Sequence, residues 1–383
     1  MLFRSEPFAV RPTSETVIGH MYSKWIQSWR DLPVLINQWC NVMRWEKRPR
    51  LFLRTSEFLW QEGHTAHATE AEAREETLKM LEVYRQLMED VLALPVVPGE
   101  KTEGERFPGA VDTYTCEAMM SDAKALQAGT SHFLGQNFAR AFEIRFQNKA
   151  GDLEECWTTS WGISTRLIGA LIMTHSDDDG LILPPRVAPT KTVLLPISTD
   201  ETLLDESLLP RAREFSRQLN DAMGGLHTFV DTQFHMRPGD RFFHHLQRGV
   251  PLRLELGEKD MKAGTVRAVR RDTGERLDIA HDALVPTVTK VLEDIQASMY
   301  TRARAFREEH TSFAGSYEEL KALLSERGGF VEAYFAGSPE DERRIREETG
   351  GATPRCIPLS DSSRGKCVVT GREGRRTIFA KAY

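Results

Sequence analysis

The stretch Asn41-Val-Met-Arg-Trp-Glu46, followed by Leu53-Arg-Thr-Ser-Glu-Phe-Leu-Trp-Gln-Glu-Gly-His64, decides the fold expected for this chain. Both parts are apolar runs of strand character, and the basic segment Lys47-Arg-Pro-Arg50 separates them, so the stretch predicts a β-hairpin with a charged tip. Guanidinium suits phosphate oxygens, an aromatic face suits a purine, and a carboxylate accepts hydrogen bonds from an amino group. From these residues alone two interpretations stay open: a nucleotide site, or a half-buried hairpin with a solvated tip.

The composition is that of an ordinary globular protein. The 383 residues are 40% hydrophobic and 28% charged, which is enough for two or three domains with cores of their own. No apolar run approaches the roughly 18 to 20 residues of a membrane helix, and the amino end carries no export signal. The five scattered cysteines argue against a disulfide framework, so we expect a cytoplasmic protein. A net charge of -6 means that nucleic-acid binding would require local basic patches.

Polar side chains gather at two predicted helix starts. Thr13-Ser-Glu15 follows an extended segment that begins at Phe8 and opens a helix expected to end near Arg30; it could simply cap that helix. Residues 158–173 predict a polar strand end feeding an apolar helix, in which Arg166 could pair with a carboxylate or reach solvent.

Two further segments complete the first half of the chain. Residues 69–94 predict a long amphipathic helix that acts as scaffold. Gln127-Ala-Gly-Thr-Ser-His132 predicts a turn that offers backbone donors, hydroxyls and an imidazole at one point. Such a turn could be a binding site or only a hydrogen-bonded turn.

The hairpin residues resemble a known motif. Met43-Arg-Trp-Glu46, with Arg54 and Glu57-Phe58, resembles motif 2 of class II aminoacyl-tRNA synthetases. Arg11-Pro-Thr-Ser-Glu15 and Leu35-Ile-Asn-Gln-Trp39 are closely similar to prolyl-tRNA synthetases of the type found in eukaryotes, archaea and some bacteria. Residues 158–173 then resemble motif 3.

The resemblance implies a proline-tRNA ligase that uses ATP, with Mg²⁺ bridging the phosphates, to form prolyl-adenylate and transfer proline to tRNA(Pro). It implies that Arg44 contacts the α-phosphate and the proline carboxylate, and that Arg166 contacts the γ-phosphate; these are the expected catalytic residues. The residues implied for proline are Thr13, Glu15, Arg44, Glu62, His64, His132, Ser160 and Gly162. Those implied for ATP are Arg44, Glu46, Phe58, Gln127, Thr130 and Arg166.

We expect an α/β and α+β multidomain fold. The resemblance implies a class II catalytic core with an antiparallel sheet over residues 1–189 and an anticodon-binding α/β domain over 190–286. Alternating strands and helices in the second region predict a mostly parallel sheet. Residues 287–383 are expected to form a small α+β domain that resembles a zinc-binding type.

The candidates for tRNA contact in the second region are Lys259 and Asp260, which match the family pattern, and Arg270 and Arg271 of a basic run at 267–276. The basic run could equally be a solvated strand face. The helix segment Arg241-Phe-Phe-His-His-Leu246 departs from relatives that carry acidic residues there, so anticodon reading at this helix is expected to differ.

The C-terminal region keeps too few cysteines for a metal. Relatives hold zinc there with four cysteines, whereas this chain retains Cys356 and Cys367. Two thiolates cannot complete a tetrahedral shell, so we expect no structural zinc and no other metal site in the protein.

The spacing of the motifs bears on editing. About 100 residues separate Glu62 from Arg166, too few for the catalytic strands and a large editing insertion. Because a missing methylene changes affinity by only about 1 to 3 kcal/mol, alanine would be rejected weakly, and a separate protein would have to supply any correction.

Motif 1, which builds the dimer interface of class II enzymes, would lie upstream of Met1. We therefore expect a homodimer where that motif is present, and we keep a second hypothesis: a truncated or non-catalytic paralogue that binds tRNA or a partner synthetase. A histidyl- or threonyl-like enzyme is disfavoured by Trp60-Gln-Glu-Gly-His64.

Overall fold

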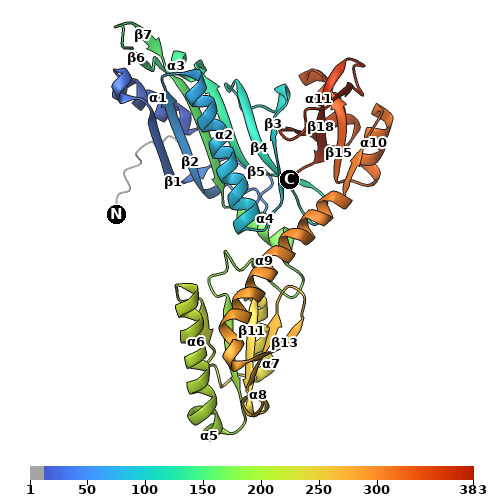
Figure 1. Ribbon diagram of the computed structural model, residues 1–383. Helices are drawn as coiled ribbons and strands as arrows, with labels where there is room; N and C mark the ends of the chain where they lie inside the picture. Colours follow the sequence, from blue (N-terminus) through green and yellow to red (C-terminus); the bar gives the residue numbers. More distant parts are fainter. Residues whose placement is uncertain (1–12) are drawn as a thin grey trace, which may run out of the picture. The chain divides into compact units, whose positions relative to one another are not determined.

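The computed structural model describes residues 13–383 and divides them into two compact units (Figure 1). Unit 1 contains the described residues up to Leu87 together with Val96–Ala170 and Arg307–Tyr383, and unit 2 contains Met88–Pro95 and Leu171–Phe306. The extended segment expected from Phe8 and the similarity at Arg11 lie outside the described residues, as does the segment expected before Met1.

An 11-stranded sheet, counted over the described residues, organises unit 1. Its order is β1-β2-β8-β5-β4-β3-β16-β18-β15-β14, with β17 paired to β18. Its strands are β1 (Val34–Met43), β2 (Glu57–His67), β3 (Val96–Glu100), β4 (Asp112–Met119), β5 (Ala125–Gly135), β8 (Trp157–Ser164), β14 (Thr311–Phe313), β15 (Phe330–Phe335), β16 (Ala352–Pro358), β17 (Arg364–Lys366) and β18 (Glu373–Lys381). The predicted hairpin is confirmed, because β1 and β2 pair antiparallel from Val34 opposite Ala66 to Met43 opposite Glu57.

The C-terminal strands extend the catalytic sheet. Ile357 and Pro358 of β16 pair antiparallel with Glu100 and Gly99 of β3. In Figure 1 the orange and red C-terminal elements accordingly lie beside β3 and β4. One continuous sheet therefore contains both the β1-β2 hairpin and β18, the last strand of the chain.

Helices cover the sheet of unit 1. They are α1 (Ser14–Trp25), α2 (Glu70–Gln86), α3 (Asn137–Phe142), α4 (Arg166–His175), α10 (Tyr317–Glu326) and α11 (Pro339–Glu348), with 3-10 turns η1 (Trp29–Asp31) and η3 (Glu103–Glu105) and a hairpin of β6 (Arg145–Gln147) and β7 (Leu153–Glu155). A capping box of Thr69 and Glu72 starts α2, and its buried stripe packs on β5 and β8 (Figure 1). The π-helical turn η2 (Leu87–Val91) follows α2.

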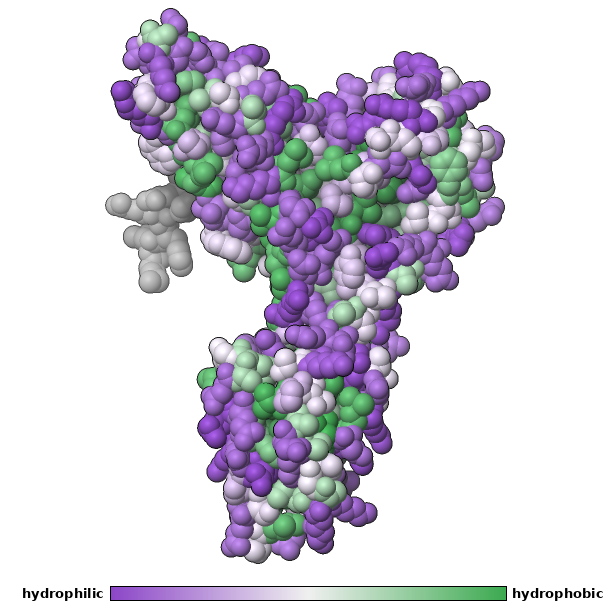
Figure 2. Space-filling model, in the orientation of Figure 1, coloured by the Kyte–Doolittle hydropathy of each residue, from purple (hydrophilic) through white to green (hydrophobic). Residues whose placement is uncertain are grey.

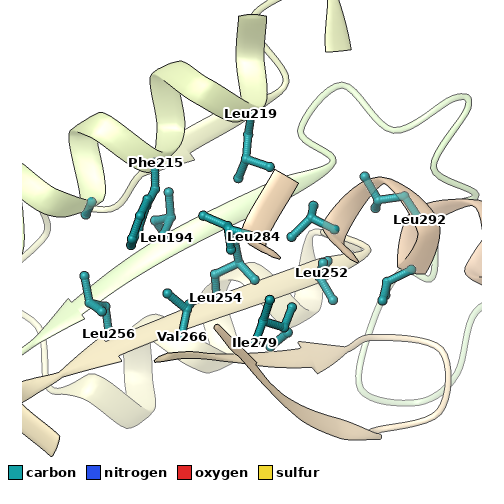
Figure 3. Close-up of a cluster of buried hydrophobic side chains, with 14 of the residues drawn as sticks. Leu194, Phe215, Leu219, Leu252, Leu254, Leu256, Val266, Ile279, Leu284 and Leu292 are labelled. Atoms are coloured by element: carbon teal, nitrogen blue, oxygen red, sulfur yellow. The ribbon is translucent and has the colours of Figure 1, made fainter. Parts of the chain in front are cut away.

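Unit 2 is built on a five-stranded sheet in the order β10-β9-β11-β12-β13. Its strands are β9 (Thr192–Ile197), β10 (Thr228–Val230), β11 (Leu252–Gly257), β12 (Thr265–Arg270) and β13 (Arg276–Ala280), and its helices are α5 (Glu201–Leu203), η4 (Leu204–Leu208), α6 (Leu209–Met223), α7 (Pro238–Gln247), α8 (Glu258–Ala263), η5 (His281–Ala283) and α9 (Leu284–Glu309). Figure 3 shows Leu194, Leu252 and Leu254 of the sheet meeting Phe215 and Leu219 of α6 in its core.

The structure corrects some local predictions. The sheet of unit 2 is not mostly parallel, because β12 and β13 pair antiparallel while β9, β10 and β11 are parallel. The first helix ends at Trp25 rather than near Arg30, since the Asp31 carboxylate accepts the N–H groups of Gln27 and Ser28 and starts a new turn.

The segment 127–132 is not a turn. It lies inside β5, which pairs with β4 on one side and β8 on the other. Its polar side chains are tolerated there because strand alternation turns several of them toward a pocket rather than the core.

The surface drawn in Figure 2 is largely hydrophilic, with hydrophobic residues in patches. Among residues 13–383, no helix combines the length and apolar character needed to span a bilayer.

Candidate active site

A pocket of about 280 Å³ in unit 1 is lined mainly by β2, β5 and β8. It brings together most of the residues expected from the sequence: Thr13, Glu15, Arg44, Phe58, Glu62, Gln127, Thr130, His132, Ser160, Gly162 and Arg166. We call it the active-site pocket.

Strand register explains why distant residues meet here. Glu62 of β2 lies opposite Gly162 of β8, which lies opposite Thr130 of β5. The adjacent row on the same face contains His64, Ser160 and His132. Residues two apart on a strand share a face, so these rows form one continuous polar surface. A Cβ at Gly162 would lie 3.2 Å from the carbonyl oxygen of Gln61, so the absence of a side chain lets β8 lie close to β2 in this row.

One end of the polar surface holds carboxylates and imidazoles. His64 Nε2 lies 3.8 Å from Glu15 Oε1 and 3.9 Å from Glu62 Oε2. Although burial opposes it, the nearby imidazole of His64 and a hydrogen bond from Thr13 lower the pKa of Glu15 to about 2. Burial lowers the pKa of His132 to about 4 despite the nearby Glu15. Glu15 is therefore charged and His132 neutral at pH 7, which suits a cationic ligand.

Glu62 is held in place by neighbours outside the rows. Its Oε1 accepts hydrogen bonds from Ser14 Oγ and Gln38 Nε2, both at 2.5 Å. The side chains of His64 and Ser160, by contrast, each keep a buried polar atom that has no hydrogen-bond partner among residues 13–383: Nε2 and Oγ. Buried polar groups are normally satisfied, so these atoms mark a place where a ligand can bind.

The other end of the pocket is rich in arginine. Arg166 donates from Nε to the Leu53 carbonyl at 3.0 Å and from Nη1 to the Gln127 carbonyl at 3.2 Å. Burial, together with the positive charges of Arg54 and Arg44, lowers the pKa of the Arg166 guanidinium. Such a concentration of positive charge favours a polyanion.

Arg44 stands against two aromatic rings. Its guanidinium carbon lies 5.4 Å from the ring centroids of both Phe58 and Trp60, which meet edge to face. These cation-π contacts hold an exposed side chain at the mouth of the pocket while leaving its N–H donors available to a ligand.

Two predicted residues do not line this pocket. Glu46 lines a separate basic pocket, where its carboxylate accepts the Arg48 N–H and lies 3.7 Å from Arg54. His64 borders a separate small cavity of about 20 Å³, which Glu15 and Tyr22 also line.

The structure adds residues that the sequence did not indicate: Trp60, Glu105, Arg106, Phe107, Thr113, Ala128, Gly129, Trp161, Ile163 and Ser164. Period-two alternation from Phe58 could have indicated Trp60. Thr113 and Phe107 had no such signal, because they reach His132 through strand pairing and a loop; Phe107 and His132 lie with ring centroids 4.6 Å apart.

Three family models match successive parts of the chain. Residues 3–175 match the tRNA synthetase class II core domain (G, H, P, S and T), residues 191–291 the anticodon binding domain, and residues 317–383 the prolyl-tRNA synthetase C-terminal domain. These matches confirm the fold class expected from the sequence.

Curated relatives are similar over nearly the full sequence. Proline-tRNA ligases of Roseiflexus sp. (strain RS-1) and Amoebophilus asiaticus (strain 5a2) are each 51% identical over 99% of this chain, which spans 79% and 77% of their lengths. The proline-tRNA ligase of Chloroflexus aurantiacus (strain ATCC 29366 / DSM 635 / J-10-fl) is 53% identical over 99% of this chain and 79% of its own length. The chain belongs to the prolyl-tRNA synthetase family.

In this prolyl-tRNA synthetase family member, the arginines expected to contact tRNA are engaged in internal ion pairs. Arg270 pairs with Asp272 at 2.8 Å, and Arg271 pairs with Asp177 at 2.6 and 2.9 Å. Asp260 Oδ2 accepts the Gly257 N–H and caps α8, and Lys259 is exposed. Of these residues, Lys259 is therefore the one presented to solvent.

The departure from the prolyl-tRNA synthetase pattern at α7 has a structural counterpart. Buried Arg241 donates from Nε to Asp231 Oδ1 at 3.1 Å and from Nη1 to the Pro196 carbonyl. His245 Nε2 lies 2.6 Å from Asp231 Oδ2. These side chains fix α7 against the ends of β9 and β10 instead of facing solvent.

Proposed function

We propose that the chain is a proline-tRNA ligase that activates proline with ATP and transfers it to tRNA(Pro). The decisive observation is that one pocket joins a carboxylate end, centred on Glu15 and Glu62, to an arginine end, centred on Arg44 and Arg166. An amino acid needs both a partner for its ammonium group and a partner for its carboxylate, and ATP needs cations.

Proline would bind at the carboxylate end. Its secondary ammonium would face Glu15, which stays charged because its pKa is about 2. Ser160, whose Oγ has no partner among the described residues, and the ring of neutral His132 would shape the rest of the cavity, and Thr13 would hold Glu15 by a hydrogen bond. His64 would act on Glu15 from the small cavity that both residues line. Gly162 would admit the pyrrolidine ring close to β8.

ATP would bind at the arginine end. Arg166 would hold the γ-phosphate in a bent form, and Arg44 would bridge the α-phosphate and the proline carboxylate. Phe58 would stack on adenine, Gln127 and Thr130 would contact the nucleotide, and Glu46 would act from the neighbouring basic pocket.

Magnesium fits this scheme as an ion carried by the substrate. Among residues 13–383, no group of three His, Cys, Asp or Glu side chains could hold a metal ion by itself. Mg²⁺ commonly uses one or two protein oxygens together with substrate phosphates, and Glu105 and Gln127 offer such oxygens in the pocket. When bound, the ion would neutralise phosphate charge.

The reaction needs no protein nucleophile. A carboxylate oxygen of proline attacks the α-phosphorus, and pyrophosphate leaves; the terminal ribose hydroxyl of tRNA then attacks the carbonyl carbon of prolyl-adenylate, and AMP leaves. Arg44 and Arg166 would lower the barrier by positioning the reactants and stabilising charge that develops on phosphate oxygens.

Exchange of labelled pyrophosphate into ATP, measured with and without proline, tests the proposal. Proline-dependent exchange supports it. A folded protein that shows none, yet binds tRNA, would point instead to the non-catalytic paralogue.

We also propose that the C-terminal region contains no structural zinc. Cys356 lies in the sheet against Gly99, and burial raises the pKa of its thiol, which disfavours the thiolate that zinc requires. The Cys367 sulfur accepts the N–H groups of Ala336 and Thr370. Metal analysis of the purified protein checks this.

We propose that the chain is a prolyl-tRNA synthetase of the type found in eukaryotes, archaea and some bacteria, and that it has no editing insertion. The segment between motifs 2 and 3 supports this. Residues 68–156 form α2, η2, β3, β4, β5, α3 and the β6-β7 hairpin. We propose that a separate protein removes alanine from tRNA(Pro). Mischarged alanyl-tRNA(Pro) that persists with this protein and disappears with a cell extract would support both statements.

We propose that the protein forms a homodimer and that the interface includes β1, at the edge of the large sheet. Among residues 13–383, β1 is a terminal strand of the sheet, and its Leu35 and Trp39 side chains are 54% and 80% exposed. An apolar edge of this kind invites pairing with a second copy. Sedimentation analysis should give a dimer that Trp39→Glu weakens.

We assign residues 1–189 to catalysis, 190–286 to anticodon binding and 287–383 to support, and we place the protein in the cytoplasm, where tRNA is charged. Lys259 would contact tRNA, with Asp260 positioning its helix. Arg270 and Arg271 would contribute only where their ion pairs open.

A further inference from the structure

One side of the active-site pocket is formed by residues 101–107, which we call the pocket wall. Glu105, Arg106 and Phe107 line the pocket. The Phe107 N–H donates to Thr113 Oγ1 at 3.0 Å, and the same oxygen lies 3.1 Å from His132 Nδ1. The position of the wall thus determines how Phe107 and His132 face the ligand.

The start of the pocket wall is anchored by a buried charge cluster. Lys101 Nζ donates to Glu117 Oε1 at 2.8 Å, and Arg355 donates from Nε to Glu117 Oε2 at 3.0 Å. Lys101, Glu117 and Arg355 are 1%, 0% and 7% exposed. Arg355 belongs to β16, so the C-terminal region supplies one of the two cations that neutralise this carboxylate.

Other C-terminal side chains contact the same wall. Arg375 Nη1 donates to Glu100 Oε2 at 2.7 Å, and Glu100 Oε1 lies 3.7 Å from Arg106. The Glu342 carboxylate of α11 lies so close to Gly104 that a Cβ at that position would collide with it. The wall is therefore held by residues more than 200 positions later in the sequence.

The charge cluster also lies next to the phosphate end. Glu117 of β4 is paired in register with Gln127 of β5, and the Gln127 carbonyl accepts a hydrogen bond from Arg166. Without Arg355, Lys101 still neutralises Glu117, but the buried Oε2 atom of Glu117 loses the guanidinium that contacts it, and the structure must rearrange to satisfy this acceptor. Rearrangement at Glu117 would displace both the wall and its neighbouring strand.

We propose that Arg355 is a positioning residue for the active site: through Glu117 and Lys101 it holds residues 101–107 against His132 and thereby keeps the proline end of the pocket in shape. The inference rests on the proposed ligase function, and it assigns the C-terminal region a part in substrate binding.

The test compares Arg355→Met and Arg355→Lys with Arg343→Met, whose side chain is 65% exposed on α11. Hydrogen exchange over residues 100–113 and proline-dependent pyrophosphate exchange are measured for each. We expect Arg355→Met to lose protection over 100–113 and to raise the KM for proline about tenfold. Arg355→Lys should recover part of both effects, and Arg343→Met should match the wild type.

Unchanged protection over 100–113 in folded Arg355→Met would overturn the proposal, as would a lower melting temperature with an unaltered KM for proline. If Arg355→Met does not fold, Arg355→Lys decides in the same way, since it should show part of both effects relative to the wild type. A wild type without proline-dependent exchange would refute the ligase function, whereas the hydrogen-exchange comparison would still show whether Arg355 holds the wall.

Discussion

Glu15, which lines the active-site pocket, lies beside His64, with 3.8 Å between Glu15 Oε1 and His64 Nε2. They come from the start of α1 and from β2, which are separated by the whole of β1. The pair leaves the His64 N–H side without a hydrogen-bond partner among the described residues and holds Glu15 in its charged form. A cationic ligand completes this arrangement.

Glu15→Gln should therefore raise the KM for proline. A charge-assisted hydrogen bond contributes about 1.5 to 3 kcal/mol, which corresponds to roughly 10- to 100-fold. The KM for ATP should change little, since the arginine end is unaltered. Pyrophosphate exchange at varied proline and ATP checks both values, with exposed Glu206→Gln as the control. Equal changes in the two KM values would argue against a proline-specific role.

The stability of the protein should depend on pH through the ionisation of Glu15 and His132. The pKa of Glu15 is lowered from 4.5 to about 2, so its contribution is present above pH 4.5 and is lost as the pH falls toward 2. The pKa of His132 is lowered from 6.5 to about 4, so the unfolded chain binds a proton first and stability falls between pH 6.5 and 4. Both shifts predict acid destabilisation.

Thermal unfolding measured from pH 7 to 4 checks this expectation. The melting temperature should decline throughout that range, and His132→Gln should flatten the decline between pH 6.5 and 4. A variant with the wild-type slope would show that His132 is not held neutral in the folded state.

Arg166→Lys should reduce kcat/KM for ATP by about 100-fold, the usual effect of losing one preorganised donor in a reacting site. Lysine keeps the charge but cannot donate to the Leu53 and Gln127 carbonyls and a phosphate with fixed planar geometry. The KM for proline should stay within about threefold. Steady-state kinetics beside Arg213→Lys, an exposed control in α6, measures the effect.

Sequence patterns predicted the hairpin and the helix after Arg166 because each depends on short-range order, whereas the pocket residues were expected from the resemblance to a known family. The residues of β2 and of α4, which begins at Arg166, each show the local pattern of a strand or a helix. The turn expected at 127–132 was wrong because pairing on both sides of β5 outweighs the turn preference of Gly and Ser. The pocket wall was missed for a related reason, since its anchors Arg355 and Glu342 are brought to it only by the pairing of β16 with β3.

The Asp231 and Arg241 pair in unit 2 should be essential for local stability. Asp231→Asn leaves buried Arg241 without its counter-charge, and breaking a buried pair typically costs about 3 to 5 kcal/mol. Hydrogen exchange should become faster in β9, β10 and α7. Asp221→Asn, at an exposed ion pair on α6, should have little effect. Similar protection in both variants would mean that the buried pair does not fix α7.

Gly63→Ala tests how closely β2 and β8 pack beneath the pocket. A Cβ at Gly63 would overlap the six-membered ring of Trp161, which lines the pocket and whose ring also meets Tyr84 edge to face. Overpacking of this kind typically costs about 1 to 3 kcal/mol, so we expect a lower melting temperature and a higher KM for proline. Trp161→Phe removes the overlapping part of the ring, and the double variant Gly63→Ala/Trp161→Phe should be more stable than the sum of the single effects predicts. A double-mutant cycle by thermal unfolding measures this coupling. Strictly additive effects would show that the side chains at positions 63 and 161 do not interact sterically.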